Sequence, residues 1–253
     1  MWARELRETF HAKSERSWQM RFHSQTAGVS LTAQQPLNNI VRTAIEALAA
    51  VLGGTQSLHT NSYDEALALP TEEAVRIALR TQQVIAHETG VTNSVDPLGG
   101  SYLVERLTDE MERAAHEYFA RIDELGGMVE AIKRGFPQRE IADASFRHQQ
   151  EVDAGERVVV GVNRYQLADE PELELHRPDP AIERQQAERL QSTRAARDSG
   201  AVERLMADLK EVAATDRNLM PCLLEAARAR ASEGEMIAAL QEVFGSYTEQ
   251  PVF

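Results

Sequence analysis

The sequence has only one cysteine, Cys222, so no disulfide can form within the chain. Its longest apolar stretch, residues 47–52, is far shorter than the roughly 20 residues that a membrane-spanning helix needs. The opening residues, MWARELRETF, lack the apolar core of a secretion signal. These absences predict a cytoplasmic protein that has no membrane partner.

Basic residues are also in short supply. The chain carries 27 Lys and Arg against 40 Asp and Glu, for a net charge of −13. A protein that binds nucleic acid needs clustered Lys and Arg, whereas the arginines here alternate with glutamates, as in RIDELGG. We therefore expect no nucleic-acid partner.

Several signatures of common chemistry are missing. The seven histidines form no HxxxH or HExxH pattern, so no metal site is predicted. The chain contains no P-loop and no GxGxxG sequence, and it lacks the GxSxG elbow that carries a serine nucleophile. Conventional hydrolysis and mononucleotide or dinucleotide binding therefore have no support.

Two short polar segments, residues 21–28 and 55–61, stand out in what is present. A helix over residues 38–52, ended by Gly53 and Gly54, joins them, and Thr71 opens a second helix that runs to about residue 88. Strand, helix, strand and helix in this order are typical of a parallel α/β unit. An apolar stripe of Val41, Ile45, Leu48 and Leu52 is expected to bury one face of the first helix.

Polar side chains gather where both predicted strands end. Gln25 follows His23 on one strand face, and Asn61 follows His59 on the next strand. Polar groups at the carboxyl ends of parallel strands commonly face a ligand. Buried polar residues that bond only to one another are the alternative, but the same ending on two strands favours a ligand site. Composition does not name the ligand.

The rest of the chain is predicted to be mainly helical. Its apolar stripe over residues 103–125 is typical of a core face, and residues 157–163 are either a buried strand or an extended connection. Four further helices are expected to begin near residues 181, 201, 221 and 232. We therefore divide the chain into an α/β part, residues 1–100, and a helical part, residues 101–253, with a linker near residues 167–180.

Four segments together closely resemble the large subunit of adenosylcobalamin-dependent acyl-CoA mutases, the methylmalonyl-CoA mutase family. They are residues 21–85, which begin RFHSQTAGVSLTAQQP, and the segments VDPLGGSY, ELGGMVEAIKRG and VVVGVNRYQL. The resemblance implies the C-terminal part of a (β/α)8 TIM barrel, followed by a mainly helical segment. It also implies an isomerase that rearranges the carbon skeleton of a branched acyl-CoA by radical chemistry, with adenosylcobalamin as cofactor.

The resemblance assigns roles to particular residues. Gln25 matches a glutamine between substrate and corrin, and Gly28 matches a glycine that lets the corrin approach the backbone. Glu65 matches a carboxylate that contacts the adenosyl ribose or cobalamin, and Ala68 matches a small residue against the corrin. His59 and Asn61 belong to the same lining, with Asn61 toward the cofactor and Gln25 and His59 toward the catalytic side.

The resemblance also implies partners. The earlier barrel strands, which hold most acyl-CoA contacts, are absent, so a chain supplying the N-terminal barrel half or a homo-oligomer is expected. No His is preceded by Asp two residues earlier, so the lower axial ligand of cobalt is not supplied by this chain. The ending YTEQPVF, and Val29 after AG, resemble the split isobutyryl-CoA mutase branch, whose cobalamin-binding subunit is separate. A non-catalytic remnant or interaction module of a mutase complex is the alternative.

An incomplete barrel exposes strand edges and an apolar layer. We therefore predict that the chain expressed alone is poorly soluble or oligomeric. Size-exclusion chromatography is the measurement, and a stable monomer that unfolds cooperatively would contradict this expectation.

Overall fold

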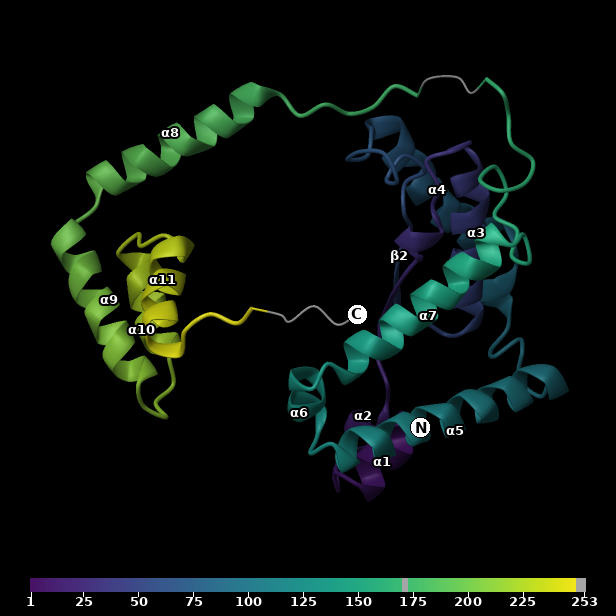
Figure 1. Cartoon of the computed structure of the whole chain (residues 1–253), viewed down its shortest axis with the longest axis horizontal. Helices are drawn as coiled ribbons and strands as arrows, with labels where there is room; N and C mark the ends of the chain where they lie inside the picture. Colours follow the sequence, from purple (N-terminus) through teal and green to yellow (C-terminus); the bar gives the residue numbers. More distant parts are fainter. Residues whose placement is uncertain (170–172, 249–253) are drawn as a thin grey trace. The chain divides into compact units, whose positions relative to one another are not determined.

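The computed structural model describes residues 1–169 and 173–248. The chain forms two compact units, of which the first comprises residues 1–177 and the second begins at residue 178 (Figure 1). Part of the predicted linker, residues 170–172, and most of the ending YTEQPVF lie outside the described residues. The division near residue 100 stays a prediction. No helix in the described ranges has the length and apolar character that crossing a membrane requires.

The first unit contains two strands, seven α-helices and two single turns of 3-10 helix within the described residues. In chain order these are α1 (Trp2–Glu8), α2 (Glu15–Trp18), β1 (His23–Gln25), η1 (Gly28–Ser30), α3 (Asn38–Leu52), β2 (Ser57–His59), α4 (Glu72–Glu88), η2 (Val91–Asn93), α5 (Tyr102–Glu124), α6 (Met128–Lys133) and α7 (Phe136–Asp153). The second contains α8 (Pro180–Ala196), α9 (Ser199–Ala213), α10 (Met220–Arg228) and α11 (Glu233–Phe244).

The predicted α/β unit is present. β1 and β2 pair in parallel, with His23 opposite Ser57 and Gln25 opposite His59, and α3 connects them. Gly53 is the C-cap of α3, and the Thr71 hydroxyl caps α4 by accepting from the Ala74 amide at 3.3 Å. The chain is thus a mainly helical α/β protein with a small parallel sheet. The eight-stranded barrel itself stays a proposal, since the described sheet has two strands.

The buried face of α3 differs from the predicted one. Asn39, Thr43 and Ala47 are buried, whereas Val41 is 59% exposed and Ile45 is 65% exposed. Hydrophobic periodicity identifies a stripe but not its neighbour, and no described element covers the Val41 side. The N-cap of this helix is Leu37 and no side chain bonds there, so neither Asn38 nor Asn39 acts as a cap.

The N-terminal segment consists of two short helices, α1 and α2, and β1 begins only after them. The chain turns at His11, whose φ of 51° interrupts the helix, and resumes as α2. The Trp18 indole donates to the Ala12 carbonyl at 2.8 Å, and the Arg7 guanidinium lies 4.9 Å from its ring centroid. Trp18 therefore joins the two N-terminal helices instead of starting β1.

Two expectations about residues 102–166 were wrong. No residue of α5 is buried, so its apolar stripe is not a core face of this chain; Leu103 is 65% exposed and Met111 is 74% exposed. Residues 157–163 form no strand beyond an isolated bridge from Val160 to Arg164. Asn163 accounts for this, since its side chain bonds the Val159 amide and the Arg157 carbonyl, both at 2.8 Å, and so folds the segment into a turn. This turn is neither the buried strand nor the extended connection that the sequence predicts.

The second unit has its own small core. Helices α9, α10 and α11 lie side by side (Figure 1) and share buried apolar residues. These are Val202, Leu209, Val212, Ala213, Ala226 and Ala239. The starts of all four helices fall within two residues of the predicted positions.

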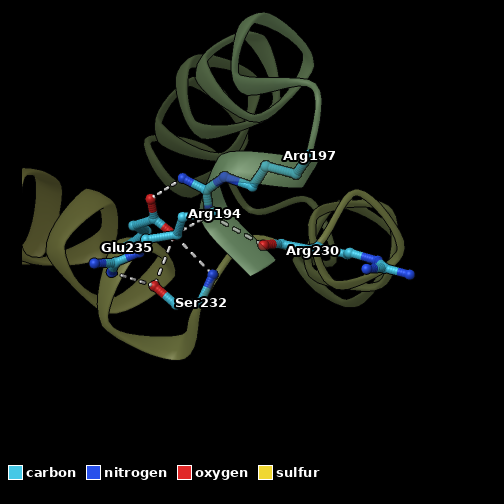
Figure 2. A network of polar contacts seen from close by, with 5 residues as sticks. All are labelled: Arg194, Arg197, Arg230, Ser232 and Glu235. Atoms are coloured by element: carbon cyan, nitrogen blue, oxygen red, sulfur yellow. Dashed lines mark hydrogen bonds and ion pairs between the residues drawn. The ribbon is translucent and has the colours of Figure 1, made fainter. Parts of the chain in front are cut away.

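A polar network joins the start of α9 to the start of α11 (Figure 2). The Arg197 guanidinium, 9% exposed, donates with both terminal nitrogens to the Glu235 carboxylate and also donates to the Arg230 carbonyl at 3.0 Å. Glu235 accepts in addition from the Ser232 amide at 2.8 Å, which completes a capping box at the start of α11. The Arg197 hydrogen bond, followed by the Ser232 bonds, holds the pKa of Glu235 well below its usual range.

We predict that Arg197→Ala lowers the free energy of unfolding of the second unit by about 2 kcal/mol at neutral pH, because it strands a half-buried carboxylate. The contribution is present above the ordinary glutamate pKa of 4.5 and is lost as the pH falls below it, since the folded pKa is depressed. Thermal unfolding followed by circular dichroism at several pH values measures both the loss of stability and its pH dependence. Glu225→Gln, in the exposed Arg228 pair, is the control and should change little. An acid profile that Arg197→Ala leaves unaltered would contradict the assignment.

Candidate functional site

One face of the β1–β2 pair is wholly polar and open. In parallel strands, residues in register share a face, so Gln25 lies beside His59 and His23 lies beside Ser57. His23 Nδ1 and Ser57 Oγ are 2.7 Å apart, and all four residues are exposed. A polar strand face of this kind suits contact with a polar ligand better than contact with a core.

The opposite side of β2 is covered by α4. The Thr60 hydroxyl, just beyond the strand, donates to the Ala78 carbonyl at 2.8 Å. Gln82 Nε2 donates to the Leu58 carbonyl at 3.1 Å and to Thr60 Oγ1 at 3.0 Å. These bonds fix which face of β2 remains accessible.

A hydrogen-bonded corner lies where the two strands end. The Thr26 hydroxyl and Asn61 Oδ1 are 2.5 Å apart, and Thr26 Oγ1 accepts from the Asn61 amide at 2.9 Å. Asn61 Nδ2 donates to Glu65 Oε2 at 2.5 Å, while the Ser62 amide donates to Glu65 Oε1 at 2.7 Å. Thr26 and Asn61 are buried and Glu65 is half-buried. Both carboxylate oxygens of Glu65 are thereby held by the chain itself.

Asp64 anchors the loop after β2 to α4. Its buried Oδ2 accepts from the Thr71 amide at 2.8 Å and from the Thr71 hydroxyl at 3.0 Å. Its carbonyl accepts from the Ala68 amide at 3.1 Å. Burial, followed by the charges of Glu73 and Asp64, raises the pKa of the neighbouring Tyr63 above 10.0, so this phenol stays neutral at physiological pH. The loop that carries Glu65 is therefore fixed at both ends.

The structure brings some of the predicted site residues together and not others. Asn61 and Glu65 are bonded, and a Cβ built on Gly28 would lie 3.7 Å from Asn61 Nδ2. Gln25 and His59 are adjacent on the open face. Ala68 lies on the Glu65 loop, but no described contact links it to the other predicted residues. The roles of all six stay predictions.

The corner leaves the backbone of Gly28 open beside the Glu65 carboxylate. Gly28 is exposed and its φ lies outside the left-handed region, so the backbone does not itself require glycine there. Any added side chain would occupy open space in front of the loop, apart from the contact with Asn61. The Glu65 carboxylate can accept further hydrogen bonds from hydroxyl groups. A ligand can therefore approach the exposed backbone of Gly28 beside the fixed Glu65 carboxylate. Among the described residues, no group of three or more His, Cys, Asp and Glu could hold a metal ion.

The sequence pattern does not single out two residues that hold this corner in place. Thr26 bonds the Asn61 side chain and the Asn61 backbone amide. Asp64 bonds Thr71. The helix-cap pattern identified Thr71, but nothing in the spacing indicated that a carboxylate seven residues earlier would bond it.

A cavity of about 650 Å³ lies elsewhere, between the end of α3 and the loop before α5. Its lining includes Gly53, Gly54, Asp96 and Pro97. Gly54 precedes the amino end of β2, so this cavity lies away from the carboxyl ends where the corner is built. Size alone does not make it a site, and the fixed polar groups favour the corner.

Comparisons with known proteins agree over almost the whole chain. A family model described as Methylmalonyl-CoA mutase matches residues 1–246. Methylmalonyl-CoA mutase of Rhizobium meliloti (strain 1021) is 48% identical over 253 residues, which cover 99% of this chain and 35% of that protein. The mitochondrial methylmalonyl-CoA mutase of Homo sapiens is 45% identical over 249 residues, which cover 98% of this chain and 33% of that protein. The 2-hydroxyisobutanoyl-CoA mutase large subunit of Aquincola tertiaricarbonis is 42% identical over a match that covers 100% of this chain and 45% of that protein. The chain spans between a third and a half of the length of these relatives.

We predict that Thr26→Val lowers the free energy of unfolding of the first unit by about 1–3 kcal/mol, because the buried backbone N–H of Asn61 loses its acceptor. Both tryptophans, Trp2 and Trp18, belong to this unit, so urea unfolding followed by fluorescence reports on it. Thr26→Ser keeps the hydroxyl and should retain most of the stability. A Thr26→Val variant as stable as the wild type would contradict the role of the hydroxyl.

Proposed function

Because the chain belongs to the methylmalonyl-CoA mutase family, we propose that it is a component of the large subunit of an adenosylcobalamin-dependent acyl-CoA mutase. In this proposal the chain contributes the last strands of a (β/α)8 barrel and the helical segment after them. The reaction is an isomerisation that moves a group between neighbouring carbons of a branched acyl-CoA. Family membership rests on the match over residues 1–246; the activity of this chain is our inference.

The observation that carries the proposal is the corner built from Thr26, Asn61 and Glu65 beside the exposed backbone of Gly28. The Asn61 side chain and the Ser62 backbone amide hold the Glu65 carboxylate, and the buried Thr26 in turn holds Asn61. Such preorganised acceptors lose little conformational entropy when a ligand hydroxyl binds. The corner therefore suits the sugar of a nucleoside-bearing cofactor.

Each predicted residue then has a task that its position supports. Gly28 and Ala68 would leave room for the corrin, while Glu65 and Asn61 would bind the adenosyl ribose. Gln25 and His59, side by side on the open strand face, would face the substrate and restrict water. When bound, adenosylcobalamin supplies the radical that starts the rearrangement.

The proposal requires partners. Acyl-CoA contacts would come from a chain that supplies the N-terminal barrel half, or from a homo-oligomer, and the cobalt's lower ligand would come from a separate cobalamin-binding subunit. The printed name of the Aquincola tertiaricarbonis relative, a large subunit, is compatible with such a division. The exposed Val41, Ile45 and Leu103 are surfaces that a partner could cover.

A second candidate has one observation in its favour. The exposed apolar residues of α3 and α5 need a covering partner whether or not chemistry follows. A non-catalytic interaction module of a mutase complex would share this property. The two candidates differ only in whether an assembled complex turns over.

The test supplies the missing parts. The chain is mixed with adenosylcobalamin and with the segments of the Rhizobium meliloti enzyme that lie outside the matched third, and acyl-CoA isomerisation is measured. Turnover that is lost in Gln25→Ala or Glu65→Ala supports the enzyme. A chimaera in which this chain replaces the matched third of that enzyme guards against failed assembly. An inactive but folded chimaera would favour the interaction module.

For the active assembly we predict that Gly28→Ala weakens the apparent affinity for adenosylcobalamin about tenfold, or roughly 1.4 kcal/mol, because a methyl group obstructs approach to the backbone. Unfolding of the chain should not change, since the added Cβ meets only an ordinary contact at 3.7 Å. Cofactor titration of the isomerase rate gives the affinity. Gly234→Ala, where a Cβ meets nothing within 4 Å, is the matched control. An unchanged affinity would remove Gly28 from the cofactor site.

A further inference from the structure

Asn39 has a side chain that is fully buried and fully hydrogen-bonded. Its Oδ1 accepts from the Thr32 amide at 3.0 Å and from Arg42 at 2.7 Å. Its Nδ2 donates to the Thr32 carbonyl and to the Tyr63 carbonyl, both at 2.9 Å. Its exposed fraction is 0%. An asparagine amide offers two donor hydrogens and an acceptor with two lone pairs, and all of them are used here.

These bonds join the two loops that hold the candidate site. Thr32 lies in the loop after β1, where the Leu31 amide donates to the Gly28 carbonyl at 3.2 Å. Tyr63 lies in the loop after β2, between Asn61 and Glu65. The Asn39 amide therefore bridges the segment carrying Gly28 and the segment carrying Glu65. A helix-capping role does not account for it, since the N-cap of α3 is Leu37.

Arg42, one turn further along α3, braces the amide from the other side. Its guanidinium donates to Asn39 Oδ1, to Thr32 Oγ1 at 2.9 Å and to the Val160 carbonyl at 2.8 Å. The segment around Val160 is the turn that follows α7, and Gln35 Nε2 donates to the Tyr165 carbonyl of the same segment at 2.8 Å. A part of the chain more than a hundred residues away thus contacts the same bridge.

We propose that Asn39 is a positioning residue that sets the spacing between the Gly28 loop and the Glu65 loop, with Arg42 as its support. The inference rests on the proposed function for its consequence in catalysis, but the bridge itself concerns this chain alone. No other side chain of similar size replaces it. Aspartate lacks the two donors, leucine lacks every polar atom, and glutamine is longer than the space allows at full burial.

The variant Asn39→Asp tests the two sides of the bridge, the loop after β1 and the loop after β2, independently. The carboxylate loses both donated bonds, to the Thr32 carbonyl and to the Tyr63 carbonyl. It still accepts from the Thr32 amide and from Arg42, so the loop after β1 keeps a bond to residue 39 while the loop after β2 loses its single one. Amide hydrogen exchange resolved by NMR on the full chain gives the readout. The amides of Asn61, Ser62 and Glu65 report on the loop after β2, and the Thr32 amide reports on the loop after β1.

We expect exchange at Asn61, Ser62 and Glu65 to quicken at least tenfold in Asn39→Asp, while exchange at Thr32 changes less than threefold. Asn38→Asp is the matched control, because the side-chain bond of Asn38 within the described residues is local, to Gln35 at 3.0 Å, and it should leave all four amides unchanged. Unchanged protection at Asn61, Ser62 and Glu65 would overturn the proposal. So would an equal loss at Thr32, which indicates general destabilisation.

Arg42→Met decides the matter if Asn39→Asp does not fold. It removes the support and leaves the Asn39 bonds to both carbonyls in place. Exchange should then quicken at Val159 and Val162 in the turn after α7, and about threefold at Ser62 and Glu65. No change at either place would overturn the supporting role and, with it, the bridge.

In an assembly whose wild-type chain turns over, Asn39→Asp should lower kcat at least tenfold while the KM for acyl-CoA changes less than threefold, because the substrate contacts lie elsewhere. Full kcat together with rapid exchange would overturn the positioning role. Absence of turnover with the wild-type chain would count against the proposed function and leave the exchange result to decide the bridge. The two failures are therefore distinguishable.

Discussion

Parallel pairing between β1 and β2 is the constraint on which the candidate site depends. Each strand has only three residues, and a pair this short is not stable in water by itself. α3 connects the strands, and side chains of α4 close the far side of β2 through Leu58 and Thr60. Because the register places Gln25 beside His59, it also directs Thr26 toward Asn61, 35 residues away in sequence. A shift by one residue would turn each of these side chains to the other face.

Elements with a local signal were predictable from the sequence. Gly53 ends α3, Thr71 caps α4, and Ser232 with Glu235 forms the capping box of α11, because each motif acts within a single helical turn. The sequence pattern put His23 and Gln25 on one strand and His59 on the next, but their register, which pairs Gln25 with His59, comes from the structure. The family resemblance, not the pattern, supplied Gly28, Glu65 and Ala68, and their roles stay proposals.

Contacts between distant segments were not predictable. Periodicity showed that Val41 and Ile45 form an apolar stripe, but the face that packs in this chain is that of Asn39 and Thr43. α5 repeats the lesson, because its stripe has no buried residue. A hydrophobic stripe indicates that a helix face is suited to burial, but the element that buries it need not belong to the same chain. The Asn39 bridge and the bond from Asp64 to Thr71 were not predictable for the same reason, because only the folded chain brings the bonded groups together.

The exposed apolar side chains of α3 and α5 have a consequence for the life of the chain in a cell. Chaperones and proteases recognise open hydrophobic surface, and small shifts in that exposure change protein abundance several-fold. Val41, Ile45, Leu103 and Met111 offer such a surface. Covering these residues, by other parts of the same protein or by a separate chain, should therefore raise the steady-state level of the protein.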